Sequence, residues 1–346
     1  MSTSNQPGVS AQSLDPIAPA DAGRARPGAA AERRRVIYRT PESTFHAFLI
    51  LTRSDSAVAL LMPALCGAAM AWWEAGMLSG FLLFVSLMGV LSTAMGFSAL
   101  CEYRDYKRCR AEAESVVEPY VTGASMMTSG LMQPAIGRNL GLILLSVGLV
   151  CSLWLVVAAG WPVLFFAGSS FLLLLAHVLP PLSLGYRGWG LAEISLFLAF
   201  GLLPLLCSYY VQARALTLSP VWLSIPLGLL GVLTFLNYDL LHQRRDRLMR
   251  KRTLVAGIEP LRALDLSALL SVGAYASIVL IVALARLPLS LLIGLLALPV
   301  ALGAFARVHR ERLTGSDLLE VYRASTSALA LTGALICLAL WVDKVL

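Results

Sequence analysis

The sequence predicts an all-α polytopic membrane protein with about nine transmembrane helices. Of its 346 residues, 58% are hydrophobic and only 14% are charged, and the mean hydropathy is +0.76. A soluble domain is nearer half apolar and a quarter charged. The apolar residues also come in runs of about 20, the length that a helix needs to cross a bilayer. Lys and Arg, finally, are concentrated on alternate connections, as membrane topology requires.

Nine apolar runs give the expected spans, and charged or turn-forming residues separate them. Arg286 and Pro288 alone divide the seventh run from the eighth. The expected spans cover residues 55–75, 78–101, 136–158, 161–180, 190–212, 219–241, 264–285, 287–306 and 324–343.

The first 40 residues differ from the rest of the chain. Residues 1–40 are rich in Ala, Pro, Ser, Gly and Arg and contain no apolar run. We therefore expect a disordered cytoplasmic tail ahead of a transmembrane domain at 41–346. The lack of an apolar run argues against a secretory signal. An Arg- and Ala-rich transit peptide is the other interpretation, which Asp15, Asp21 and Glu32 disfavour.

The basic residues predict which side of the membrane each connection faces. With a cytoplasmic N-terminus, only Arg214, Arg286 and Lys344 of the 27 Lys and Arg lie outside, which leaves 24 inside. This asymmetry predicts a multi-pass protein of the inner (plasma) membrane, with the lipid bilayer as its partner. It also accounts for the net charge of +7 without nucleic acid as a partner.

Acidic side chains gather at the cytoplasmic ends of two expected spans. Glu102 and Asp105 are three residues apart, so they share a helix face. Asp239 and Asp246 are seven apart, with His242 between them. Carboxylates on facing helix ends suit Mg²⁺, which prefers oxygen ligands and commonly bridges to substrate phosphates. The other interpretation is that these acids are solvated loop charges that balance nearby arginines.

Three segments resemble motifs of a known family. Residues 101–109 read Cys-Glu-Tyr-Arg-Asp-Tyr-Lys-Arg-Cys, and residues 242–254 read His-Gln-Arg-Arg-Asp-Arg-Leu-Met-Arg-Lys-Arg-Thr-Leu. These two are similar to the Asp-rich motifs of the UbiA-type membrane prenyltransferases. Residues 179–190 read Leu-Pro-Pro-Leu-Ser-Leu-Gly-Tyr-Arg-Gly-Trp-Gly, and resemble a segment of the 1,4-dihydroxy-2-naphthoate polyprenyltransferase branch. The resemblance covers residues 50–310 in order and orientation.

The resemblance implies a bundle of nine helices and an enzyme that transfers a prenyl or polyprenyl group. The donor would be a polyprenyl diphosphate, and the acceptor an aromatic molecule such as a naphthoate or another quinone precursor, as in menaquinone biosynthesis. Mg²⁺ would be the cofactor, held by Glu102, Asp105 and Asp246. The implied catalytic residues are Asp105, Asp246, Lys107, Tyr186 and Arg187, and the implied substrate-binding residues are Lys251, Arg252, His177, Asp239 and His242.

Several positions depart from the family motifs. Cys101 and Glu102 stand where the first motif has Asn and Asp, and His242 stands where the second motif begins with Asp. Imidazole suits Zn²⁺ or Cu²⁺ better than Mg²⁺, so Asp239, one turn earlier, is the expected substitute for His242. These degenerate motifs leave a second interpretation open, a non-catalytic isoprenoid- or lipid-binding paralogue. A transporter of an anionic solute is a third, but the outer halves of the spans are nearly uncharged.

Overall fold

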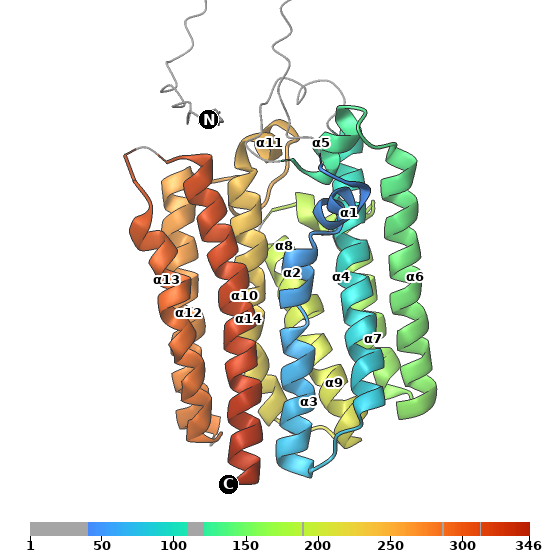
Figure 1. The fold of residues 1–346 in the computed structure, drawn as a ribbon, viewed down its shortest axis with the longest axis vertical. Coiled ribbons are helices and arrows are strands. Elements are labelled where there is room, and N and C mark those ends of the chain that lie inside the picture. Colours follow the sequence, from blue (N-terminus) through green and yellow to red (C-terminus); the bar gives the residue numbers. More distant parts are fainter. Residues whose placement is uncertain (1–40, 109–120, 189, 286, 312) are drawn as a thin grey trace, which may run out of the picture. The chain divides into compact units, whose positions relative to one another are not determined.

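The computed structural model describes residues 41–108, 121–188, 190–285, 287–311 and 313–346. Every regular element in these residues is helical, because a helix satisfies its own backbone hydrogen bonds in a solvent that offers none. Figure 1 shows the long helices side by side in a bundle. The predicted all-α membrane fold is confirmed. The expected disordered tail at 1–40 lies outside the described residues.

Eight described helical segments are long and apolar enough to cross a membrane, and a ninth apolar helix, α7 (Pro162–Val178), has 17 residues. Each overlaps one of the nine predicted spans. The eight segments are α2 with α3 (Ser54–Ala59, Met62–Ala75), α4 (Gly80–Arg108), α6 (Pro134–Ala159), α8 with η3 and α9 (Leu191–Leu196, Phe197–Leu202, Leu203–Ala213), α10 (Ser219–Leu241), α12 (Pro260–Ala285), η4 with α13 (Leu289–Ala297, Leu298–Arg307) and α14 (Gly315–Val345).

Helices α4 and α6 approach closely because small residues line their contact. A Cβ added to Gly96 of α4 would meet the backbone nitrogen of Leu145 at 2.8 Å and the carbonyl oxygen of Gly141 at 2.9 Å. Lipid tails are as apolar as leucine side chains, so transmembrane helices associate through close packing at such small residues. This contact fixes the position of α4, whose last turns carry the first acidic motif.

The fifth span contains a turn of π-helix, η3, which ends two residues before Pro204. Proline lacks the N–H that continues an α-helical ladder, and π-turns arise where that ladder is interrupted. Gly201 lies in this turn, where an added Cβ would meet Cα of Gly228 on α10 at 2.5 Å. The turn therefore packs the fifth span tightly against α10, which leads into the second acidic motif.

Short elements gather at one end of the bundle, which we call the polar end. Figure 1 shows α1, α5 and α11 at this end and the C-terminus at the other. Thr122 begins α5 with a capping box, in which its side chain accepts a hydrogen bond from the N–H of Ser125 at 3.1 Å. The short elements are α1 (Thr44–Thr52), α5 (Gly123–Thr128), η2 (Leu184–Tyr186) and α11 (Gln243–Leu248).

Candidate functional site

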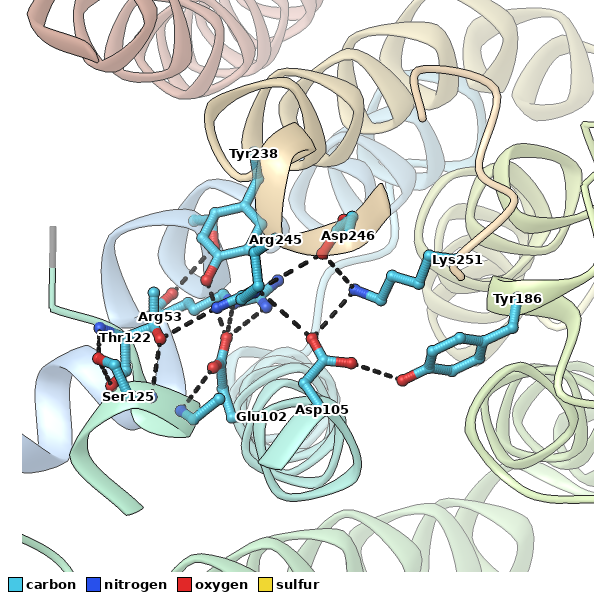
Figure 2. Close-up of polar contacts among 12 residues, drawn as sticks. Arg53, Glu102, Asp105, Thr122, Ser125, Tyr186, Tyr238, Arg245, Asp246 and Lys251 are labelled. Carbon is cyan, nitrogen blue, oxygen red and sulfur yellow. Dashed lines mark hydrogen bonds and ion pairs between the residues drawn. The ribbon is translucent and has the colours of Figure 1, made fainter. Parts of the chain in front are cut away.

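Two carboxylates from distant parts of the chain converge on one lysine at the polar end. Lys251 Nζ lies 3.0 Å from Asp105 Oδ2 and 3.4 Å from Asp246 Oδ1. Asp105 belongs to the last turns of α4 and Asp246 to α11, and Figure 2 shows Lys251 between them. Arg245 also reaches Asp105 Oδ2 at 3.5 Å. The two motifs therefore form one buried cluster, since both carboxylates are at most 1% exposed.

Tyr186 makes a further contact with Asp105. Its hydroxyl donates a hydrogen bond to Asp105 Oδ1 at 2.5 Å, and it comes from η2, in the connection between α7 and α8. Burial, together with the neighbouring Asp105 carboxylate, raises the pKa of Tyr186 well above its usual value. Tyr186 therefore keeps its proton and stays a hydrogen-bond donor at neutral pH.

Lys251 balances the two acids. Burial on its own lowers the pKa of an ammonium group, but the carboxylates of Asp105 and Asp246 outweigh it and hold the pKa of Lys251 well above its usual value. Burial raises the pKa of Asp246, although Lys251 and Arg245 act in the opposite direction. Lys251 is therefore a permanent positive charge, whereas a further cation would favour the charged form of Asp246.

Glu102 points away from this cluster, although it precedes Asp105 by only three residues. Its Oε1 accepts hydrogen bonds from Arg53 Nε at 3.1 Å and from the hydroxyl of Tyr238 at 2.8 Å. Its Oε2 accepts from the N–H of Ala124 at 2.9 Å. Arg53 lies between α1 and α2, with its guanidinium carbon 3.5 Å from the centre of the Tyr238 ring. Glu102 therefore connects α4 to α2, α5 and α10, as Figure 2 shows.

A cavity of about 600 Å³, which we call the inner cavity, lies on the membrane side of the Asp105–Lys251 pair. Phe97, Cys101 and Asp105 line it at intervals of four along α4, and Phe235 and Asp239 do so along α10. Residues four apart lie on one helix face, so both helices change from apolar to acidic toward the polar end. The other polar side chains of its wall are Arg53, His177, Tyr186, Glu193, Lys251 and Thr253.

Two apolar cavities adjoin the inner cavity within the bundle. A small one shares Phe97 and Val178 with the inner cavity. It shares Phe171 and Leu174 with a third cavity of about 620 Å³, lined by residues of α3, α4, α6, α7 and the fifth span. The third cavity, which we call the deep cavity, is apolar apart from one threonine and several serine hydroxyls. The three adjoining cavities, with shared side chains between them, lie in a row from charged side chains to the apolar interior, and we call this row the apolar path.

The structure brings five of the predicted site residues to the wall of the inner cavity. His177 is among them, and its Nδ1 lies 2.8 Å from Ser195 Oγ. Asp246 does not line the cavity but contacts Lys251, which does. The five residues on the wall are Asp105, His177, Tyr186, Asp239 and Lys251.

The other predicted residues lie elsewhere. Lys107 is exposed, with Nζ 5.1 Å from the centre of the Tyr103 ring. Arg187 and Arg252 line a separate, open pocket on the polar end. His242 is buried, and its ring centre lies 4.5 Å from that of Tyr238. Together with Glu102, these residues are held outside the inner cavity.

Sequence analysis missed Arg53, Arg245 and Tyr238. Arg53 follows the apolar run of α1 and precedes that of α3, and an ionisable residue in such a setting is a functional candidate. The position of Arg53 between two apolar runs could therefore have identified it as a candidate from the sequence alone. Arg245 is one of several arginines in its loop, and Tyr238 is one aromatic residue in an apolar span. Nothing in the sequence distinguishes either of them.

The oxygen donors of this cluster suit Mg²⁺. In the described part of the chain, no three His, Cys, Asp or Glu side chains are close enough to hold a metal ion by themselves. Asp105 and Asp246 face each other across Lys251 Nζ, so a Mg²⁺ ion held by both would replace this ammonium group between them. Asp246 Oδ1 has ion pairs with Lys251 and Arg245, but neither of its buried oxygens accepts a hydrogen bond from the described residues. Mg²⁺ is usually held by one or two carboxylates and completed by phosphate oxygens and water. The pair fits a Mg²⁺ ion that binds together with a phosphate group.

Several solved structures have a fold similar to that of this chain. The solved structure of a UbiA homolog from Archaeoglobus fulgidus bound to DMAPP and Mg²⁺ is similar, with a TM-score of 0.56 and 14% identity over 84% of this chain and 98% of that chain. The same homolog bound to GPP and Mg²⁺ is similar with a TM-score of 0.56 and 13% identity, over 84% of this chain and 99% of that chain. A solved structure of a digeranylgeranylglyceryl phosphate synthase is similar with a TM-score of 0.50 and 16% identity, over 87% of this chain and 98% of that chain.

Likenesses at such low identity show the fold alone, and no curated protein matches the chain. The sequence profile of the UbiA prenyltransferase family, however, matches residues 60–325, which is most of the chain and includes both acidic motifs. This chain belongs to the UbiA prenyltransferase family.

Proposed function

We propose that this protein transfers a prenyl or polyprenyl group from an allylic diphosphate to an aromatic acceptor in the membrane. The observation that carries the proposal is the convergence of Asp105 and Asp246 on Lys251, at the charged end of an apolar path. Family membership supports the same activity. The homolog from Archaeoglobus fulgidus, whose fold this chain shares, was solved with DMAPP or GPP and Mg²⁺.

The two ends of the donor match the two ends of the path. Lys251 and Tyr186 line the charged end of the inner cavity and are hydrogen-bond donors, so they suit the diphosphate oxygens. The prenyl tail would then run past Phe97 and Phe171 toward the deep cavity. Apolar burial of the tail supplies affinity in proportion to the area removed from water.

The first chemical step breaks the bond between the allylic carbon and the diphosphate oxygen. The diphosphate leaves with the bonding electrons, and Lys251 and Tyr186 stabilise its growing negative charge. Asp105 and Asp246 would hold Mg²⁺, which would supply further positive charge to stabilise the leaving diphosphate. The apolar walls exclude water, so the allylic cation forms its new bond with an electron-rich ring carbon of the acceptor. That carbon then loses its proton, which Asp239, a lining residue of the inner cavity, would accept.

The chemical class that we propose for the acceptor is based on one segment of the sequence. Residues 179–190, which carry Tyr186 to the inner cavity, resemble the naphthoate branch of the family. We therefore propose a naphthoate or another quinone precursor as acceptor. The strong excess of Lys and Arg on one set of connections supports a polar end and an N-terminus in the cytoplasm, in the inner (plasma) membrane.

Transfer of a radiolabelled prenyl group tests the proposal. Membranes that contain the full chain are incubated with a labelled polyprenyl diphosphate and a panel of aromatic acceptors, and we expect a labelled product that requires the acceptor. The control variant Asp265→Asn removes an exposed acid paired with Arg310 on another part of the surface, and should leave transfer unchanged. Donor binding without transfer to any acceptor would overturn the proposal in favour of an isoprenoid-binding paralogue.

A further inference from the structure

We infer that Glu193 carries the proton released by the acceptor out of the inner cavity, to water at the polar end; this inference rests on the proposed function. Each transfer moves one proton from a ring carbon to Asp239. A carboxylate that has taken up this proton is no longer a base, so Asp239 has to lose it before the next cycle. The site therefore needs an exit for protons in addition to a base.

Glu193 lines the inner cavity together with Asp239. Glu193 belongs to the first turn of α8, and Asp239 to the last turn of α10. Oε2 of Glu193 is buried, and no described residue donates a hydrogen bond to it. A buried acceptor without a partner costs free energy, which a proton taken up from the cavity would offset. Glu193 is thus a second carboxylate on the same wall that is able to receive the proton.

The other oxygen of Glu193 is bonded toward water. Its Oε1 accepts a hydrogen bond from the N–H of Leu254 at 3.1 Å. Leu254 lines the open pocket at the polar end, which has a volume of about 940 Å³ and is accessible to water because Arg187 and Arg252 on its wall are exposed. Thr253, the preceding residue, lines both this pocket and the inner cavity. The carboxyl group of Glu193 is therefore attached to the wall between the two.

The other ionisable side chains of the inner cavity are less suited to this task. Arg53 and Lys251 are cations, and Asp105 is paired with Lys251 at 3.0 Å. The tyrosine of this wall keeps its proton. His177 has Nδ1 at 2.8 Å from a serine hydroxyl, and its Nε2 lies against the backbone of η2. Glu193, in contrast, combines an oxygen without a partner and an oxygen at the wall of the open pocket.

The relay moves one proton and no electrons. The ring carbon gives its proton to the carboxylate of Asp239, and the electrons of the broken C–H bond restore the aromatic ring. Asp239 passes the proton to Glu193, directly or through a water molecule. Rotation about the terminal torsion of Glu193 exchanges its two oxygens, and the proton then leaves to water in the open pocket. Both carboxylates end the cycle in the charged form in which they began it.

The first and the later turnovers of Glu193→Gln test the inference. Glutamine keeps the size of the side chain and an oxygen for the N–H of Leu254, but it takes up no proton. The full chain in lipid nanodiscs is mixed with excess donor and acceptor in mildly alkaline buffer, where Asp239 starts charged, and product is measured by rapid quench. We expect a first turnover at the wild-type rate, and later turnovers at least about tenfold slower. Loss of rate in both phases alike, or in neither, would overturn the inference.

Chemical rescue of Glu193→Ala distinguishes a proton carrier from a support of the loop. Formate fits the space of the lost carboxylate and takes up a proton. Formamide has the same shape and accepts the hydrogen bond of Leu254, but it is not a base at this pH. We expect formate to restore most of the lost steady-state rate and formamide to restore none. Equal rescue by the two would show that only the hydrogen bond matters, and would refute the relay.

Glu259→Gln is the matched control, because Glu259 is an exposed glutamate that lies 3.6 Å from Arg262 and does not line either cavity. Its turnovers should match those of wild type, and a burst as large as that of Glu193→Gln would refute the assigned exit. Wild-type transfer together with wild-type kinetics in Glu193→Gln would refute the relay and leave the proposed function intact. Absence of product from the wild-type chain with every acceptor would refute the proposed function, and the relay with it.

Discussion

Arg53 and Glu102 form a buried ion pair at the polar end, with Arg53 Nη2 2.5 Å from Glu102 Oε1. The side chains are 10% and 1% exposed. The pair joins the α1–α2 junction to α4, and the second oxygen of Glu102 holds Ala124 at the start of α5. Glu102 thus stabilises the elements around the inner cavity instead of lining it.

The first prediction is that Glu102→Ala destabilises the protein. Removal of one partner leaves the Arg53 guanidinium buried without its counter-charge, which costs about 3–5 kcal/mol. The free energy of unfolding in detergent measures the loss. Arg53→Met combined with Glu102→Met should cost less than the two single changes together. Unchanged stability with lost Mg²⁺-dependent donor binding would instead make Glu102 a metal ligand, as the resemblance implied.

The second prediction concerns the converging acids. Asp105→Asn and Asp246→Asn keep the side-chain size but remove the charge that would hold Mg²⁺ against the leaving group. Because that charge is needed most in the transition state, each change should lower kcat by about 100-fold or more and alter KM for the donor far less. Steady-state transfer kinetics give both constants. Robust transfer by the double variant would refute the assigned site, provided that Asp265→Asn behaves as wild type.

The third prediction is that chelation stops transfer. No three acidic, His or Cys side chains in the described ranges are grouped to hold a metal by themselves, so the ion should bind weakly without the diphosphate and exchange readily. A chelator should therefore abolish transfer within minutes, and added Mg²⁺ should restore it. Calorimetry with a non-hydrolysable diphosphate analogue should show tighter binding with Mg²⁺. Equal binding in chelator would contradict the metal site.

The fold was predictable from the sequence because an apolar run long enough to cross the hydrocarbon core of a bilayer satisfies its backbone hydrogen bonds there as a helix. The site was predictable only where a motif fixes a position, as for Asp105, Tyr186 and Lys251. Glu102 and Asp105 are three residues apart, which places them about 60° apart around a helix. That angle directs Glu102 to Arg53 and Asp105 to the cavity.

Lys107 and Arg53 show two reasons why a sequence motif does not locate every residue of the site. Lys107 follows Asp105 by two residues, about 200° around the helix, so it lies on the far face and is exposed. The order of residues in a motif does not by itself show which face of the helix each residue occupies. Arg53 acquires its role from a partner 49 residues away, and only tertiary packing brings the two together.

The fourth prediction concerns topology. With the polar end in the cytoplasm, a cysteine introduced by Arg244→Cys faces the cytoplasm and one introduced by Lys344→Cys faces the outside. Both positions are exposed, at the polar end and near the C-terminus. Labelling with a membrane-impermeant thiol reagent, in a background without the six native cysteines, should mark only Lys344→Cys in intact cells. Labelling of both from one side would rule out an odd number of spans between Arg244 and Lys344, where the structure has three: α12, η4 with α13, and α14.

The last prediction concerns the length of the donor. Ala167 lines the deep cavity from α7, so Ala167→Phe would fill space that the end of a long prenyl tail needs, whereas a tail of one or two isoprene units stops before it. Overpacking of a filled site costs about 1–3 kcal/mol, so kcat/KM for a long polyprenyl diphosphate should fall about tenfold or more, with little change for the short donors. Leu164→Phe is the matched control, because Leu164 is 55% exposed one turn away on the same helix and does not line the cavity. Equal losses for donors of every length would indicate a general defect or a tail that lies elsewhere. A loss that grows with tail length, and is absent in Leu164→Phe, would locate the end of the tail between α4 and α7.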